Sequence, residues 1–134
     1  MLMPPISRFM TAKPVTVGRA ATLADAHRLM REHAIRHLPV VDDKGELCGV
    51  VSERDLHLIE TLTEASPEDA QVEDAMVEHP FVVTGDTALD EVAEIMGEHK
   101  YGSVVVMGRD GVEGIFTAVD ACQVLAQLVR RAVA

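Results

Sequence analysis

Aromatic and basic residues are scarce in this 134-residue chain, which contains no Trp, one Tyr and three Phe. Proteins that bind single-stranded nucleic acid stack its bases on aromatic side chains, and this chain has few of them. The 12 Lys and Arg residues stand against 22 Asp and Glu, which gives a formal net charge of −10. Most of the acidic excess lies in residues 68–134. Because a phosphate backbone requires a basic surface, we expect no nucleic-acid partner.

Long apolar runs are also missing, since no stretch approaches the ~20 residues that a membrane span needs. The first five residues lack the basic and apolar regions of a secretory signal. Cysteine is limited to Cys48 and Cys122, which have no close spacing. We therefore expect a cytoplasmic protein without a membrane partner, in which both cysteines are buried and reduced.

Catalytic motifs are absent: the sequence has no nucleophile elbow, no Walker-type glycine loop and no paired catalytic carboxylates. We therefore expect no enzymatic activity. His33 and His37 are four residues apart, but the second of them begins a predicted strand, so they should not share a helix face. The remaining histidines, His27, His57, His79 and His99, show no ligand spacing. We expect no metal site.

The chain does contain an internal repeat with a spacing of 66 residues. This spacing aligns the following identical residues: Met10 and Met76, Pro14 and Pro80, Val17 and Val83, Leu23 and Leu89, Met30 and Met96. After a one-residue deletion, a spacing of 65 aligns Asp55 with Asp120. A repeat of this length is one supersecondary unit used twice, and neither copy usually buries its apolar face alone. We expect repeat one (1–62), an acidic linker (63–71) and repeat two (72–134) to form one compact module.

Each repeat has the pattern strand, helix, strand, strand, helix. In repeat one, Thr22 precedes apolar residues at helical spacing and is typical of an N-cap. Two apolar runs then flank a turn at Gly45, which predicts a β-hairpin, and Ser52 caps the next helix. An extended segment is expected at 13–17. Repeat two predicts the same elements at 81–83, from Leu89, at 103–107, at 112–116 and after Thr117, with short helical turns at 6–10 and 72–76.

This order of elements resembles a tandem pair of cystathionine-β-synthase (CBS) domains over roughly residues 6–129. The motifs that carry the resemblance are Pro14-Val15-Thr16-Val17, Arg36-His37-Leu38-Pro39-Val40-Val41, Gly49-Val50-Val51-Ser52-Glu53-Arg54-Asp55, Pro80-Phe81-Val82-Val83, Gly102-Ser103-Val104-Val105-Val106 and Gly114-Ile115-Phe116-Thr117-Ala118-Val119-Asp120. The resemblance implies an α/β (α+β) fold in which two β-α-β-β-α repeats pack with pseudo-twofold symmetry and form two clefts.

The resemblance also implies a regulatory function. Many CBS pairs bind an adenosine-containing ligand such as AMP, ADP, ATP, S-adenosylmethionine or NAD as a regulatory ligand. They usually catalyse no reaction, so we expect no required cofactor. It places ligand contacts at Thr16, Val17, Arg36, His37, Ser52, Arg54, Asp55, Val82, Val83, Thr117 and Asp120.

Asp55 and Asp120 follow the capping residues Ser52 and Thr117 by three positions. In the family, an Asp at this place accepts hydrogen bonds from the two ribose hydroxyls, which suits the acceptor sites of a carboxylate. The free N–H groups of the adjacent helix N-terminus suit a phosphate. The alternative is that each Asp only stabilises its helix N-terminus.

The two expected clefts differ in their polar residues. By family geometry Thr16 contacts adenine in the Asp120 cleft, whereas its counterpart Val82 has no side-chain hydrogen bond to offer. The Asp55 cleft keeps Arg54 beside its Asp, and the Asp120 cleft would use Arg36 and His37 for the phosphate. The alternatives are that Thr16 is only a strand residue and that the cations are solvated surface groups. We expect at most one tight site, at the Asp120 cleft.

Two functional interpretations remain open. The chain is either an adenosine-ligand sensor that changes its conformation or its affinity for an unknown effector protein, or a dimerisation or scaffold module without a ligand. Apolar residues on the last helix, such as Leu125 and Leu128, predict a homodimer.

Overall fold

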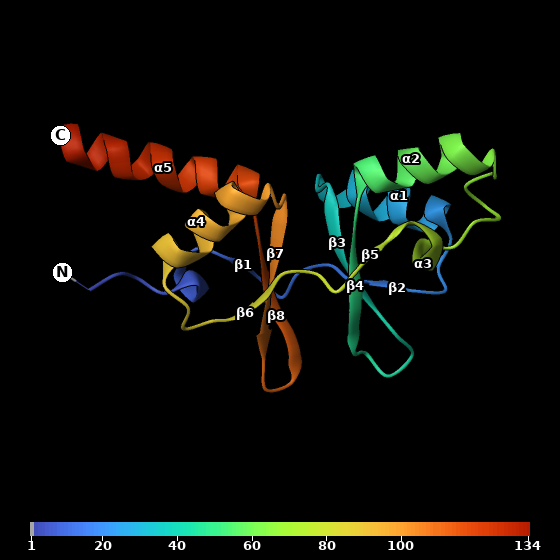
Figure 1. Cartoon of the computed structure of the whole chain (residues 1–134), viewed down its shortest axis with the longest axis horizontal. Coiled ribbons are helices and arrows are strands. Elements are labelled where there is room, and N and C mark those ends of the chain that lie inside the picture. The colour runs from blue at the N-terminus through green and yellow to red at the C-terminus, as the bar shows by residue number, and fades with distance from the viewer. Residues whose placement is uncertain (1) are drawn as a thin grey trace. The chain divides into compact units, whose positions relative to one another are not determined.

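Two four-stranded sheets organise the chain in the structure, a computed structural model that describes residues 2–134. One sheet belongs to a compact central unit, residues 14–80, and the other to a terminal unit in which residues 2–13 join residues 81–134 (Figure 1). The mixed α/β fold expected from the sequence is confirmed. Among the described residues, no helix is long and apolar enough to cross a membrane.

The sheet of the central unit has the strand order β2-β3-β4-β5. Strands β2 and β3 are parallel, while β3, β4 and β5 are antiparallel neighbours. The hairpin turn expected between β3 and β4 is present, with Gly45 at a φ of 79°. The elements are β2 (Val17–Gly18), α1 (Leu23–His33), β3 (His37–Val41), β4 (Leu47–Ser52), α2 (Glu53–Thr63), α3 (Val72–Ala75) and β5 (Val77–Glu78).

The terminal unit repeats this topology with the strand order β1-β8-β7-β6. Here β6 and β7 are parallel, and β8 pairs antiparallel with both β7 and β1. Its hairpin turn uses Gly111 at a φ of 110°. The elements are the 3-10 helix η1 (Ile6–Arg8), β1 (Thr11–Ala12), β6 (Val82–Thr84), α4 (Leu89–His99), β7 (Ser103–Gly108), β8 (Gly111–Thr117) and α5 (Ala118–Val133).

Each unit has its own hydrophobic core. Helix α1 buries the face predicted from its apolar spacing, through Leu23, Ala26 and Met30. Helix α4 does the same in the terminal unit through Leu89, Val92 and Met96. The core of the central unit also contains buried residues that follow α2, namely Ala70, Val72 and Ala75.

The two units exchange short segments: each contains a segment that the sequence assigns to the other repeat. In the central unit, Val72 N–H donates to Ala21 C=O at 2.8 Å, and in the terminal unit Ile6 N–H donates to Thr87 C=O at 2.8 Å. These bonds are equivalent under the 66-residue spacing. The segment that pairs with the chain just before α4 therefore comes from the beginning of the sequence. The segment that pairs with the start of α1 comes from residues 67–72.

Residues 63–71, expected to be a linker, are part of the central unit. Pro67 and Ala70 accept backbone hydrogen bonds from Ala24 and Leu23, the first residues of α1, at 2.9 and 3.0 Å. Polar composition did not indicate this role, because the contacts use backbone carbonyls.

Two local expectations were wrong. Of the extended segment expected at 13–17, only Val17 belongs to a strand, β2, and Lys13 has a φ of 50° and donates its N–H to Glu113 C=O of β8 at 2.9 Å. Both cysteines are free thiols, as expected, but Cys122 is exposed on α5 rather than buried. Cys48 is partly buried, and this burial raises the pKa of its thiol.

Candidate functional site

The N-terminus of α2 carries the first expected ligand-binding carboxylate. Strand β4 ends at Ser52, whose side-chain oxygen accepts a hydrogen bond from Asp55 N–H at 3.1 Å. In return, Asp55 Oδ2 accepts from Ser52 N–H at 2.9 Å. This reciprocal capping box satisfies two helix-terminal donors and leaves Asp55 Oδ1 outside it.

The N-terminus of α5 has the same geometry in the terminal unit. Thr117, the last residue of β8, accepts from Asp120 N–H at 3.2 Å, and Asp120 Oδ2 accepts from Thr117 N–H at 2.9 Å. Both carboxylates are half-buried at the end of a sheet. The expected placement of Asp55 and Asp120 in the first turns of two capped helices is therefore found.

A third capping box, at α1, provides an internal comparison. Asp25 Oδ2 accepts from Thr22 N–H at 3.1 Å, and Arg28 donates to Asp25 Oδ1 at 3.2 Å. The hydrogen bonds from Thr22 are the main cause of the lowered pKa of Asp25, and Arg28 lowers it further. In this box both carboxylate oxygens have partners within the helix. The boxes of α2 and α5 have no basic residue three positions after the Asp, where Arg28 stands in α1.

Basic residues gather beside α2. The carbonyl of Arg36 accepts from Glu53 N–H at 2.9 Å, and His37 pairs with Ser52 between β3 and β4. Arg54 follows in the first turn of α2, and both arginines are exposed. The central unit thus brings Arg36, His37, Ser52, Arg54 and Asp55 to one end of its sheet.

Beside α5, the positions equivalent to Arg36, His37 and Arg54 hold no basic residue. Gly102 C=O accepts from Ala118 N–H at 3.0 Å, and Ser103 pairs with Thr117. Val119 takes the position of Arg54 and is 61% exposed. The two helix N-termini thus differ in the basic residues that lie next to them in their own unit. The expected combination of Asp120 with Arg36, His37 and Thr16 stays a prediction.

The remaining expected ligand residues lie on the first strand of each unit. Thr16 is exposed immediately before β2, toward the end of β3 at which His37 lies, because β2 and β3 are parallel with Val17 opposite Val40. Val17 is only 4% exposed, and its side chain is part of the core of the central unit. On β6, Val82 is 41% exposed and Val83 packs against the core of the terminal unit.

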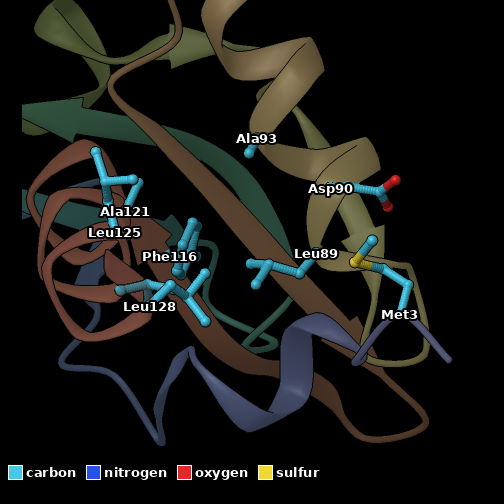
Figure 2. A pocket seen from close by; sticks show the side chains of 9 residues that line it. Met3, Leu89, Asp90, Ala93, Phe116, Ala121, Leu125 and Leu128 are labelled. Atoms are coloured by element: carbon cyan, nitrogen blue, oxygen red, sulfur yellow. The ribbon is translucent and has the colours of Figure 1, made fainter. Parts of the chain in front are cut away.

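An apolar groove of about 310 Å³ lies between α4 and α5 in the terminal unit. Figure 2 shows Leu125 and Leu128 of α5 and Leu89 and Ala93 of α4 around Phe116. The groove is lined by Met3, Leu89, Asp90, Ala93, Phe116, Ala121, Val124, Leu125 and Leu128. With one carboxylate and no other polar side chain in its lining, it suits an apolar side chain or helix more than a nucleotide.

Between α1 and α2 lies a cluster of side chains that could ligate a metal ion, and it was not expected from the sequence. His27 Nε2 lies 2.6 Å from Glu60 Oε1, and His57 Nδ1 lies 3.7 Å from Glu60 Oε2. The two imidazole ring centres are 5.3 Å apart. The only sequence signal was the spacing of His57 and Glu60, which places them on one helix face. His27 joins them only because α1 packs beside α2.

Comparison with known proteins identifies the repeated unit. The family model of the CBS domain matches twice, at residues 6–58 and 72–127. Together the two segments cover most of the chain.

Three related proteins show how widely the module is used. A structure described as that of the acetoin utilization protein AcuB from Vibrio cholerae is 33% identical, with a TM-score of 0.85 over 96% of this chain and 95% of that one. The structure of CBSX2 in complex with AMP is 29% identical, with a TM-score of 0.76 over 92% of this chain and 97% of that one. Inosine-5'-monophosphate dehydrogenase from Helicobacter pylori is 32% identical over 80% of this chain, which spans only 21% of that enzyme.

Proposed function

The chain belongs to the CBS domain family, and we propose that it is a regulatory module that binds an adenosine-containing ligand. Ligand binding changes its conformation or its affinity for an effector protein. A ligand produces such a change only if it binds one state more tightly than the other. The ligand class is AMP, ADP, ATP, S-adenosylmethionine or NAD.

The observation that carries this proposal is the pair of capping-box carboxylates at α2 and α5. A carboxylate has about four acceptor sites, and the box uses one oxygen for a single backbone N–H. Asp55 and Asp120 therefore retain acceptor capacity for the two hydroxyls of a ribose. A hydrogen bond to a charged group contributes about 1.5–3 kcal/mol.

The surroundings of the two carboxylates suit a phosphorylated ligand. Helices α2 and α5 are 11 and 16 residues long, and their N-termini present backbone N–H groups to an anion. Beside Asp55, Arg36 and Arg54 supply positive charge in an otherwise acidic chain. The AMP complex of the related CBSX2 supports an adenine nucleotide as the first ligand to test.

A thermal-shift panel tests the proposal with AMP, ADP, ATP, S-adenosylmethionine and NAD on the wild type and three variants. Asp120→Asn and Asp55→Asn keep an acceptor for the capping box but remove the charge offered to a ribose. Asp25→Asn makes the same change in the capping box of α1, where Arg28 occupies the second oxygen, and is the matched control.

We expect one of these ligands to raise the melting temperature of the wild type, because a ligand at 100 times its Kd stabilises a fold by about 2.7 kcal/mol. Asp120→Asn should reduce this rise most, while Asp25→Asn should preserve it. An equal loss of the ligand-induced rise in all three variants would indicate that Asp55 and Asp120 act only as helix caps. No rise with any ligand would favour a module without a ligand.

The proposal gives residues 2–134 no catalytic role. The similarity to inosine-5'-monophosphate dehydrogenase concerns 80% of this chain but only about a fifth of that enzyme. Regulation by ligand binding requires only the differential affinity described above.

A second candidate function is dimerisation through α5. None of its residues is buried, and five apolar side chains are 48–80% exposed: Val119, Leu125, Leu128, Val129 and Val133. The C-terminal turns of α5 extend past the strands of the unit (Figure 1). An apolar surface of this kind marks an interaction site. Sedimentation should show a dimer that Leu128→Glu weakens and the adjacent polar control Gln127→Glu does not.

A further inference from the structure

The cluster formed by His27, His57 and Glu60 between α1 and α2, the α1–α2 cluster, has the composition of a metal site. Its three donor atoms, one from each residue, all lie within 4.8 Å of one another. We propose that the α1–α2 cluster binds one Zn²⁺ ion, or a divalent transition-metal ion of the same ligand preference. This inference does not depend on the proposed adenosine ligand.

The donor set favours zinc over magnesium or calcium. Two imidazole nitrogens and one carboxylate oxygen are common zinc ligands, whereas magnesium and calcium select oxygen. Two histidines and one Glu leave a fourth coordination position for water. His57 is 63% exposed on this side, so solvent reaches the cluster.

The three donor atoms lie within 4.8 Å of one another and must move closer to the spacing of zinc ligands when the ion binds. Zinc bonds of about 2.0–2.1 Å in a tetrahedral arrangement place two ligand atoms about 3.3 Å apart. The 3.7 Å separation of His57 Nδ1 and Glu60 Oε2 is close to this value. His27 Nε2 and Glu60 Oε1 now share a hydrogen bond of 2.6 Å and must separate by about 0.7 Å.

The helices hold the three ligands in place through their neighbours. Ala26 and Leu56, which precede His27 and His57, are both fully buried in the core of the central unit. The side chains of His27 and Glu60 are each 21% exposed, so their range of movement is limited. A site held by packed helices loses less entropy on binding than one on mobile loops.

The same contacts are compatible with a simpler role, in which the His27–Glu60 hydrogen bond only fastens α1 to α2. His57 distinguishes the two possibilities. It lies 3.7 Å from Glu60 and is mostly exposed, so a fastening role does not require it, whereas zinc binding does. His33, exposed on the same helix as His27 but outside the α1–α2 cluster, provides a matched control.

The experiment titrates the full chain with Zn²⁺ against a chromogenic chelator and compares the wild type with His57→Gln, Glu60→Gln and His33→Gln. We expect one ion per chain in the wild type and a rise in melting temperature with Zn²⁺. His57→Gln and Glu60→Gln should each weaken binding by about tenfold or more, while His33→Gln should bind like the wild type. Because His57 is exposed, His57→Gln should melt like the wild type without metal.

Co²⁺ provides a second readout, since its visible absorption reports the coordination geometry. The wild type should give a spectrum of four-coordinate Co²⁺, which His57→Gln should lack. The proposal is overturned if the wild type does not compete with the chelator, or if His57→Gln retains the wild-type affinity. Equal weakening by His33→Gln and His57→Gln would also overturn it, because it would indicate non-specific binding to surface histidines.

Discussion

At the scale of single residues, Gly49 and Gly114 illustrate why the repeat conserves a residue without a side chain. Both lie on the returning strand of a hairpin, opposite a short strand from elsewhere in the chain, and they pair with Glu78 and Ala12. A Cβ atom at Gly49 would stand 2.8 Å from the carbonyl oxygen of Val77. Glycine is required here by the close approach of a neighbouring backbone.

Gly49→Ala should therefore destabilise the protein, by about 1–3 kcal/mol, because the backbone of β5 must move to admit the methyl group. Gly97→Ala is the matched control, since this helical glycine has open space around its Cβ position and alanine is the better helix former. We expect Gly97→Ala to stabilise by about 0.5–1 kcal/mol. Urea denaturation measures both changes, and a neutral Gly49→Ala would contradict the close approach.

At the scale of elements, three of the four long helices within residues 2–134 begin with the same capping box. Thr22, Ser52 and Thr117 each accept a hydrogen bond from an Asp three residues later. Helix α4 begins at Leu89, and its N-cap residue, Ala88, provides no side-chain cap. The starts of α1, α2 and α5 were predictable from the sequence, because a capping residue and its partner act over three positions.

The capping box of α1 should make the stability of the protein depend on pH. The pKa of Asp25 is lowered in the folded state, chiefly by hydrogen bonds from Thr22. A carboxyl group with a lowered pKa contributes its stability above the unfolded value of about 3.9, and loses it as the pH falls through the folded pKa. Below that window both states are protonated.

Asp25→Asn should therefore be less stable than the wild type at neutral pH, by about 0.3–1 kcal/mol, with the difference shrinking as the pH falls below about 4. Denaturant unfolding of both proteins between pH 3 and 7 measures this difference directly, since contributions from the other carboxyl groups cancel. A difference that stays constant over the whole range would show that the charge of Asp25 has no part in the effect.

At the scale of the whole molecule, the exchange of short segments was the part of the fold that the sequence did not reveal. The repeat at 66 residues predicted two similar halves and the order of their elements. The structure instead assigns residues 70–78 to the first repeat's core and residues 4–12 to the second's. Sequence patterns could not show this, because two similar repeats offer equivalent backbone partners to either segment.

The candidate functional residues also differ in whether the sequence predicted their positions. The positions of Asp55 and Asp120 follow from local capping signals, and the structure places them as expected. The α1–α2 cluster depends on the packing of two helices separated by a hairpin, so His27 and His57, 30 positions apart, carried no local signal.

The segment exchange makes a prediction about fragments of the chain. The buried residues of the central core all lie between Val17 and Ala75, so a fragment of residues 14–80 contains the complete core. A fragment of residues 1–62, the first sequence repeat, lacks Ala70, Val72 and Ala75, as well as the carbonyls that cap α1. Two fragments of similar length thus differ in whether their hydrophobic core is complete.

We expect the 14–80 fragment to unfold cooperatively and the 1–62 fragment to be largely unfolded at the same temperature. A domain of about 65 residues has little stability to spare, so the loss of three buried side chains and an edge strand is decisive. Circular dichroism melting measures both fragments, and a mixture of 1–62 with a peptide of residues 63–80 tests the reason directly. Recovery of a cooperative transition in that mixture would assign the missing stability to α3 and β5, whereas a cooperative 1–62 fragment on its own would show that the sequence repeat is also the folding unit.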